Sequence, residues 1–162
     1  MTHAVSAASK GDAVKPLHNA STADSYADLP FLPAGGVASA KGFKACGIHA
    51  GFRADPKRLD FALVAADQPA ACAAVFTTNV FCSAPVTVSK EHLDGAGYGI
   101  ARAVAINSGI ANAATGDKGL QTARQSSGIV ADALGCPVQE VLVASTVVIG
   151  QHLRMEPFES GA

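Results

Sequence analysis

The stretch from residue 101 to residue 144 constrains the fold most, because its hydrophobic period changes twice. Ala101–Ile106 alternates as a strand does, with Val104 and Ile106 on one face. A turn is predicted at Asn107-Ser108-Gly109. Beyond it, apolar and small residues recur at three- and four-residue steps, which predicts one core-facing stripe of a helix. This stripe consists of Leu120, Ala123, Ser127, Val130 and Leu134.

The ends of this helix are also marked in the sequence. Thr115 and Asp117 are both plausible N-cap residues. Gly135 is well placed to end the helix in a left-handed conformation, and Pro137 prevents its continuation. A second strand is predicted at 141–144. Strand, helix and strand in this order form a β-α-β unit, so we expect a mixed α/β fold.

Upstream of this unit the sequence predicts further strands. Asp67-Gln68-Pro69 is read as a turn between two of them, which suggests an antiparallel pair. Gly95-Ala96-Gly97-Tyr98-Gly99 lacks the spacing of a dinucleotide-binding motif and is expected to be a loop. The predicted strands are Lys44–Phe52, Leu59–Ala66, Ala71–Thr77 and a short edge strand Pro85–Ser89.

The organisation of the chain is predicted to be simple. Residues 1–28 are expected to form a disordered tail, because they show no strand or helix period. Residues 29–162 are expected to form one α/β domain. Lys10 and Lys15 are not followed by an apolar segment, so we expect no secretory signal and a cytoplasmic location. The apolar runs are too short to span a membrane.

Composition narrows the classes of partner. The net charge of -1 argues against nucleic acid or an anionic membrane, because both require a basic surface. Hydrophobic residues make up 49% of the chain and charged residues only 15%. Two interpretations fit: a domain rich in small residues, or part of a larger assembly whose partner covers apolar surface.

No cofactor or metal site is expected. The four cysteines are too far apart for a C-x-x-C motif, and without a secretion signal they are expected to be reduced. His49, His92 and His152 are isolated, with no second ligand at a helix or strand spacing. We expect each of these histidines to have a structural or surface role.

Four segments, in this order and spacing, resemble the ornithine acetyltransferase (bifunctional glutamate N-acetyltransferase) family. The resemblance covers about residues 31–155. Its segments are Gly42-Phe43-Lys44-Ala45 with Gly47; Ala74-Val75-Phe76-Thr77-Thr78-Asn79 with Ala84-Pro85-Val86; Asn107-Ser108-Gly109 with Ala111-Asn112-Ala113 and Thr115-Gly116; and Val141-Leu142-Val143-Ala144-Ser145-Thr146 with Val148-Ile149-Gly150.

The resemblance implies an enzyme that moves acetyl from N-acetylornithine, or in some members from acetyl-CoA, to glutamate in arginine biosynthesis. It also implies a layered α/β sandwich similar to the N-terminal-nucleophile group, incomplete in this chain. In the family, the precursor cleaves itself at an Ala-Thr bond, and the new N-terminal Thr heads a β chain and forms the acyl-enzyme. A Thr hydroxyl attacks well only when a neighbouring amine takes its proton.

Two residues are implied as catalytic by the same resemblance. A Thr hydroxyl and the backbone N–H of the following Gly form the family's oxyanion hole; the matching residues are Thr146 and Val147. Any residue except Pro keeps a backbone N–H, so the donor survives the replacement. If the position requires positive φ, Val147 either strains the loop or turns its amide away. Ile110 stands where the family has Asn, and Ala114 where it often has Cys or Gly.

The segment after Gly150 departs furthest from the family pattern. The Thr-rich segment, the Lys-Gly segment and the cleavage site that follow in the family are not present in residues 151–162. We therefore expect a truncated α-chain portion, inactive alone, that needs a C-terminal β-chain partner and forms homo- or hetero-oligomers. The alternative is a non-catalytic remnant or interaction module of the same family.

Overall fold

The computed structural model describes residues 3–4, 35–94 and 97–161. Most of the tail predicted for residues 1–28 lies outside these ranges, and so does the predicted start of the domain near Leu29. The strands are β1 (His3–Ala4), β2 (Phe43–Ile48), β3 (Phe61–Ala73), β4 (Tyr98–Ile110) and β5 (Val141–Val148). The helices are η2 (Val37–Ser39), α1 (Ala84–His92), α2 (Gly116–Leu134), η3 (Val138–Glu140) and α3 (Glu156–Gly161).

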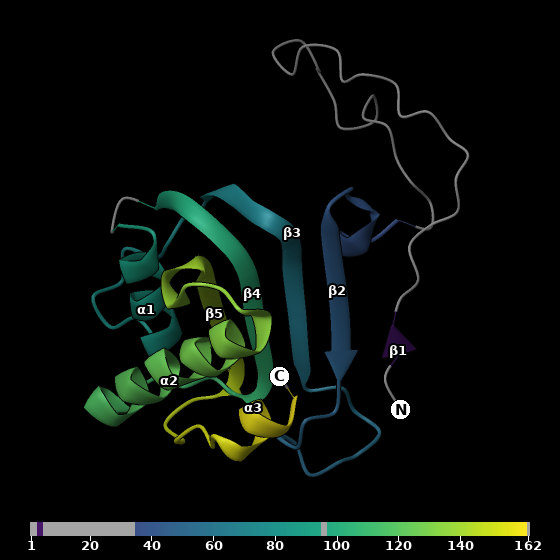
Figure 1. Cartoon of the computed structure of the whole chain (residues 1–162). Coiled ribbons are helices and arrows are strands. Elements are labelled where there is room, and N and C mark those ends of the chain that lie inside the picture. The colour runs from purple at the N-terminus through teal and green to yellow at the C-terminus, as the bar shows by residue number, and fades with distance from the viewer. Residues whose placement is uncertain (1–2, 5–34, 95–96, 162) are drawn as a thin grey trace, which may run out of the picture.

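The five strands form one sheet in sequence order. The pairs from β1 to β4 are antiparallel, whereas β4 and β5 are parallel. The three α-helices lie on the same side of the sheet (Figure 1). In the part of the chain that the structure describes, none of the helices is both long and apolar enough to cross a membrane.

The predicted β-α-β unit is confirmed as β4, α2 and β5. Helix α2 begins after Thr115 and ends at Gly135, whose φ of 61° is the left-handed conformation expected of a terminal glycine. Thr115 makes no side-chain capping hydrogen bond. Of the predicted stripe, Ala123, Ser127 and Val130 are buried, while the two leucines at its ends are half-buried.

The two predicted strands Leu59–Ala66 and Ala71–Thr77 merge into the single strand β3, which begins at Phe61 and ends at Ala73, so the antiparallel pair predicted between them is wrong. The register of β3 against β4 shifts between Ala65 and Ala70. This irregularity accommodates Asp67-Gln68-Pro69, because a bulge tolerates the missing N–H of proline without ending the strand. The antiparallel partners of β3 are β2 and β4.

The edge strand predicted at Pro85–Ser89 is also wrong, since these residues lie in helix α1. The β-branched Val86 and Val88 favoured a strand locally. Pro85 is instead accepted in the first helical turn, where its missing N–H has no partner to lose. Full burial of Val88 against the sheet then overrides the local preference.

The remaining strand boundaries differ in extent. Strand β2 ends at Ile48, before the predicted end at Phe52, while β5 continues beyond Ala144 to Val148. Asn107-Ser108-Gly109 is not a turn but the end of β4, where it pairs in register with Ser145, Thr146 and Val147. Of the glycine-rich segment expected to be a loop, Tyr98 and Gly99 already belong to β4, and residues 95–96 lie outside the described ranges.

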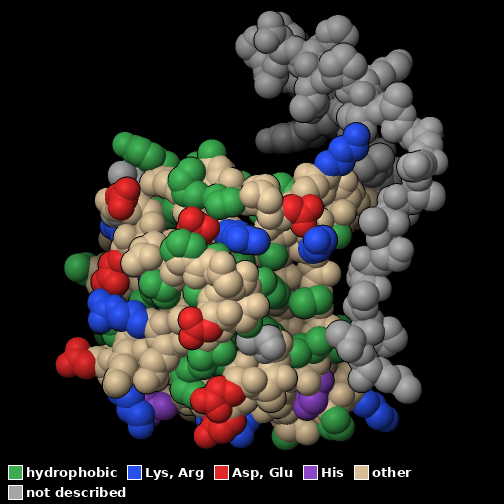
Figure 2. Space-filling model, viewed as in Figure 1, with side chains coloured by type: hydrophobic (Ala, Val, Ile, Leu, Met, Phe, Trp, Pro, Cys, Tyr) green, Lys and Arg blue, Asp and Glu red, His purple; other side chains and the backbone are tan. Residues whose placement is uncertain are grey.

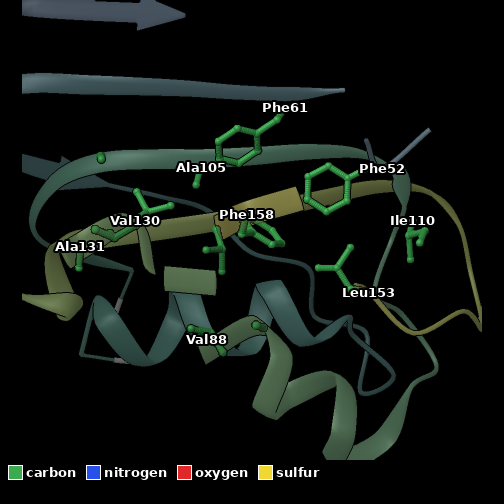
Figure 3. Packing of buried hydrophobic residues seen from close by; sticks show 13 residues of the cluster. Phe52, Phe61, Val88, Ala105, Ile110, Val130, Ala131, Leu153 and Phe158 are labelled. Atoms are coloured by element: carbon green, nitrogen blue, oxygen red, sulfur yellow. The ribbon is translucent and has the colours of Figure 1, made fainter. Parts of the chain in front are cut away.

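The main core lies between the sheet and the helices. Phe52, Phe61 and Phe158 meet edge to face or tilted, with ring centroids 4.9 to 6.2 Å apart. Figure 3 shows these rings beside Leu153 and Ile110. Phe52 lies in the loop between β2 and β3, and Leu153 lies in the loop between β5 and α3. Through these two residues the cluster holds both loops onto the sheet at one end of β4 and β5.

Candidate active site at the end of strands β4 and β5

The two residues predicted to form an oxyanion hole lie near the exposed end of β5. Thr146 pairs in register with Ser108, and Val147 pairs with Gly109. Both Thr146 and Val147 are exposed, Val147 by 51%. Side chains alternate along a strand, so Thr146 lies on the sheet face opposite to that of the buried Val141 and Val143.

The backbone of Val147 has a φ of 101°. Hard-sphere contacts disfavour this region for any residue with a Cβ, and most strongly for a β-branched one. Valine at this position was expected either to strain the loop or to turn its amide away. Because φ remains positive, the backbone at Val147 is strained. A non-glycine residue in such a region costs about 1–3 kcal/mol and is typical of functional sites.

Helix α1 binds the outer edge of β5 through two residues that contact the first half of the strand. The Ser89 hydroxyl donates to the Val143 carbonyl at 2.9 Å and accepts from the Val143 N–H at 3.0 Å. His92 Nδ1 lies 2.8 Å from the carbonyl oxygen of Val141. In a parallel pair, every second residue directs its backbone N–H and C=O toward the same side of the strand. The N–H of Val147 therefore points, like that of Val143, away from β4.

Asn112 organises the loop between β4 and α2. It is fully buried, donates from Nδ2 to the Gly119 carbonyl at 2.9 Å and accepts from the Thr115 hydroxyl at 2.8 Å. Its own carbonyl accepts from the N–H of Ala84 at the start of α1. Asn112 thus joins the beginnings of both helices next to the candidate site. In the sequence, this asparagine stands out only as part of a family motif.

The same loop is tied directly to the end of β5. The Ala111 N–H donates to the Val148 carbonyl at 2.7 Å, and the Gly150 N–H donates to the Ala113 carbonyl at 2.8 Å. These bonds hold the backbone that directly follows the strained Val147. Ala114, the milder departure from the family pattern, has a φ of 57°, a value that glycine adopts more readily.

Ile110 is an apolar residue of the core and contacts the aromatic cluster. Its carbonyl accepts from Asn107 Nδ2 at 2.9 Å, whereas Asn107 Oδ1 is buried without a hydrogen-bond partner among the described residues. The Asn-to-Ile departure noted in the sequence therefore places a hydrocarbon side chain near the end of β4, where it fills space in the core.

A depression of about 800 Å³ adjoins Val147 and was not predicted from the sequence. Three arginines and one aspartate contribute its charges, and two of the arginines, Arg53 and Arg58, lie far from Arg154 in sequence. Only their positions in the fold bring them together. Its lining consists of Gly51, Phe52, Arg53, Ala54, Asp55, Arg58, Gly109, Ile110, Val147, Val148, Gln151, His152 and Arg154.

The histidines and cysteines do not form a second reactive centre in the described ranges. No group of three or more potential metal ligands occurs there. His49 Nδ1 lies 3.2 Å from the buried Asp60 carboxylate and 3.0 Å from the Arg58 carbonyl, which is a structural role. The cysteines of these ranges are free. Burial raises the pKa of the Cys136 thiol, although Arg102 opposes the effect, so this thiol is a poor nucleophile at neutral pH.

Comparison with known proteins supports the resemblance. The model of the ArgJ family matches residues 44–162. The chain is 47% identical over 122 residues to the chloroplastic arginine biosynthesis bifunctional protein ArgJ of Ostreococcus lucimarinus, covering 75% of this chain and 26% of the relative. It is 49% identical over 125 residues to the ArgJ protein of Nitratidesulfovibrio vulgaris, covering 77% of this chain and 31% of the relative. The chain thus spans between a quarter and a third of these curated relatives.

Two solved structures share the fold. The ArgJ protein of Bacillus halodurans has a TM-score of 0.73 and 40% identity, over 80% of this chain and 66% of that structure. The ornithine acetyltransferase of Mycobacterium tuberculosis, solved in complex with ornithine, has a TM-score of 0.73 and 39% identity, over 80% of this chain and 68% of that structure. Sequence and fold agree that the chain belongs to the ArgJ family.

Proposed function

We propose that this chain supplies the oxyanion-binding part of a glutamate N-acetyltransferase, which moves acetyl from N-acetylornithine to glutamate in arginine biosynthesis. The observation that carries the proposal is the positive φ of Val147 at the exposed end of β5. This backbone conformation suits the glycine of the resembled family. Val147 keeps this conformation although it strains the backbone, which supports the view that the N–H must point in this direction.

The chemical role follows from the positions of the two donors. When a nucleophile attacks the acetyl carbonyl, negative charge develops on its oxygen. The Thr146 hydroxyl and the Val147 N–H come from adjacent residues, so one oxygen can accept from both. Strand β5 is held by β4 on one side and by Ser89 on the other, which gives these donors a fixed support. Fixed donors avoid the reorganisation that water would require.

The covalent step belongs to a partner in this proposal. In the resembled family the nucleophile is the N-terminal Thr of the β chain, whose amine accepts the hydroxyl proton. The Thr oxygen would bond to the acetyl carbon as the ornithine nitrogen leaves with a proton. Glutamate would then take the acetyl group and restore the Thr hydroxyl. The chain alone is therefore expected to show no acetyl transfer. Its cytoplasmic location remains a prediction.

A chimera tests the assignment directly. The matching segment of the Nitratidesulfovibrio vulgaris relative is replaced by the corresponding residues of this chain, and acetyl transfer to glutamate is measured. Thr146→Ala should lower the rate by about 100- to 1,000-fold, the usual effect of losing one oxyanion donor. Ser145→Ala is the matched control, because that neighbouring hydroxyl lies on the opposite sheet face. If Thr146→Ala leaves the rate of an active chimera unchanged, the oxyanion assignment is wrong.

The alternative function is a non-catalytic module of the same family. The exposed isopropyl group of Val147 favours it, because the group adds bulk beside the proposed acetyl position. The chimera separates the two proposals. A rate that Val147→Gly leaves unchanged or increases supports catalysis, whereas a folded chimera that remains inactive with Val147→Gly supports the non-catalytic module.

A further inference from the structure

The depression beside Val147 carries an excess of positive charge. Arg53, Arg58 and Arg154 line it, and Asp55 supplies the only carboxylate among its lining residues. This leaves an excess of two positive charges on a chain whose formal net charge is -1. On the face seen in Figure 2, by contrast, acidic and basic side chains are interspersed. The depression therefore differs in charge from the chain as a whole.

Among the described residues, few of the donors of these arginines have a partner. A guanidinium group has five N–H donors. Arg53 donates to the Ser108 hydroxyl at 2.8 Å, and Arg154 donates to the Gly51 carbonyl. In the described part of the chain, the ion pairs include none of the three arginines. Asp55 accepts from the Lys57 N–H at 3.0 Å and so has a partner other than an arginine.

The loop that carries Arg53 is held in place before any ligand arrives. The Asp60 carboxylate is buried and accepts from the N–H of Ala50 at 2.6 Å and from the N–H of Arg53 at 2.8 Å. Gly109 allows the close approach of this loop, since a Cβ there would lie 3.2 Å from Arg53 Cγ. Pre-formed positions reduce the entropy lost on binding.

We propose that this depression binds a small dianion, of the carboxylate or phosphate class, through the three guanidinium groups. Planar guanidinium groups match the paired oxygens of both classes and hold them by two parallel hydrogen bonds. A dianion neutralises the excess charge, whereas a monoanion does so only in part. The site shares Val147 with the proposed oxyanion position but does not depend on acetyl transfer.

Binding is measured by calorimetric titration of the full chain at constant ionic strength. The probes are succinate, inorganic phosphate, acetate and uncharged succinamide. We expect a dianion to bind at least about tenfold more tightly than acetate, given the strength of charge-assisted hydrogen bonds. Tighter binding of succinate than of phosphate assigns the carboxylate class, and the reverse assigns phosphate. Equal affinity for acetate and both dianions would overturn the proposal.

Matched variants locate the site. Arg58→Gln removes a lining cation and should weaken dianion binding by about three- to tenfold, within the range for a partly exposed ionic contact. Lys57→Gln removes a neighbouring cation that does not line the depression, and it should change affinity by less than twofold. Arg154→Gln should act like Arg58→Gln, with thermal unfolding as the check on folding. Equal losses from Lys57→Gln and Arg58→Gln would show only general surface attraction and would overturn the site.

Discussion

Val147 and Gly109 lie directly opposite each other in the β4–β5 pair, and both have positive φ, 101° and 123° respectively. Only one of these two positions is occupied by the residue that tolerates such a backbone. Glycine lacks the Cβ that produces the clash, whereas valine has a branched one. The end of the parallel pair therefore combines a relaxed and a strained residue.

Val147→Gly should stabilise the chain. Relief of the backbone strain stabilises the folded chain by about 1–3 kcal/mol, whereas the greater freedom of glycine in the unfolded chain costs about 0.5–1 kcal/mol. Little packing is lost, because Val147 is half exposed. We expect a rise in melting temperature of about 2–6 °C for a chain of this size. Val148→Gly is the control and should destabilise. A fall in melting temperature for Val147→Gly would contradict the strained conformation.

Gly109→Ala should destabilise the chain by more than about 1 kcal/mol, for two reasons that act together. The positive φ disfavours alanine, and the new Cβ would lie 3.3 Å from the Phe52 carbonyl oxygen. Gly128→Ala is a useful control, since Gly128 is inside α2 with open space around its Cβ position and should gain about 0.5–1 kcal/mol. Chemical denaturation of both variants measures the difference.

The part of the fold that sequence predicted well is the part with an uninterrupted period. Helix α2 has a periodic stripe and a terminal glycine, and both features act locally. Strand β3 and helix α1 were predicted wrongly for the same kind of reason. Pro69 suggested a break and the valines of α1 suggested a strand, but the outcome in each case depended on tertiary packing.

The candidate site divides in the same way. Thr146 and Val147 were predicted through a motif, because they are adjacent in sequence, and their role stays a prediction. Arg58 and Arg154 are far apart in sequence, and no local pattern indicates that they line one depression. The positive φ of Val147 could not be predicted from the residue type either, because valine disfavours this conformation.

Asn112→Ala should destabilise the chain strongly. The change leaves the Gly119 carbonyl without its donor and the Thr115 hydroxyl without its acceptor, while alanine takes over a φ of 49°. A loss of about 2–4 kcal/mol follows from unsatisfied buried groups. Asn79→Ala is the control, since that exposed side chain makes one local bond to the Phe81 N–H. Equal losses for the two variants would show that Asn112 does not organise the loop.

The isolated chain is expected to self-associate. Helices α1 to α3 pack on one side of the sheet (Figure 1), so no α-helix of the described residues covers the opposite face. Alternation along the strands places Val64 and Ile106 on that face, where both are only half-buried. Only 15% of the residues are charged, and a net charge of -1 gives little repulsion between molecules.

Sedimentation at tens of micromolar should therefore show dimers or larger species, together with binding of a hydrophobic dye. Ile106→Lys places a charge on the sheet face opposite the three α-helices and should shift the distribution toward monomer. Val37→Lys is the matched control, because Val37 is already 61% exposed and lies in the short helix η2, so it should leave the distribution unchanged. A single monomeric species with cooperative thermal unfolding and no dye binding would mean that the chain covers this face by itself.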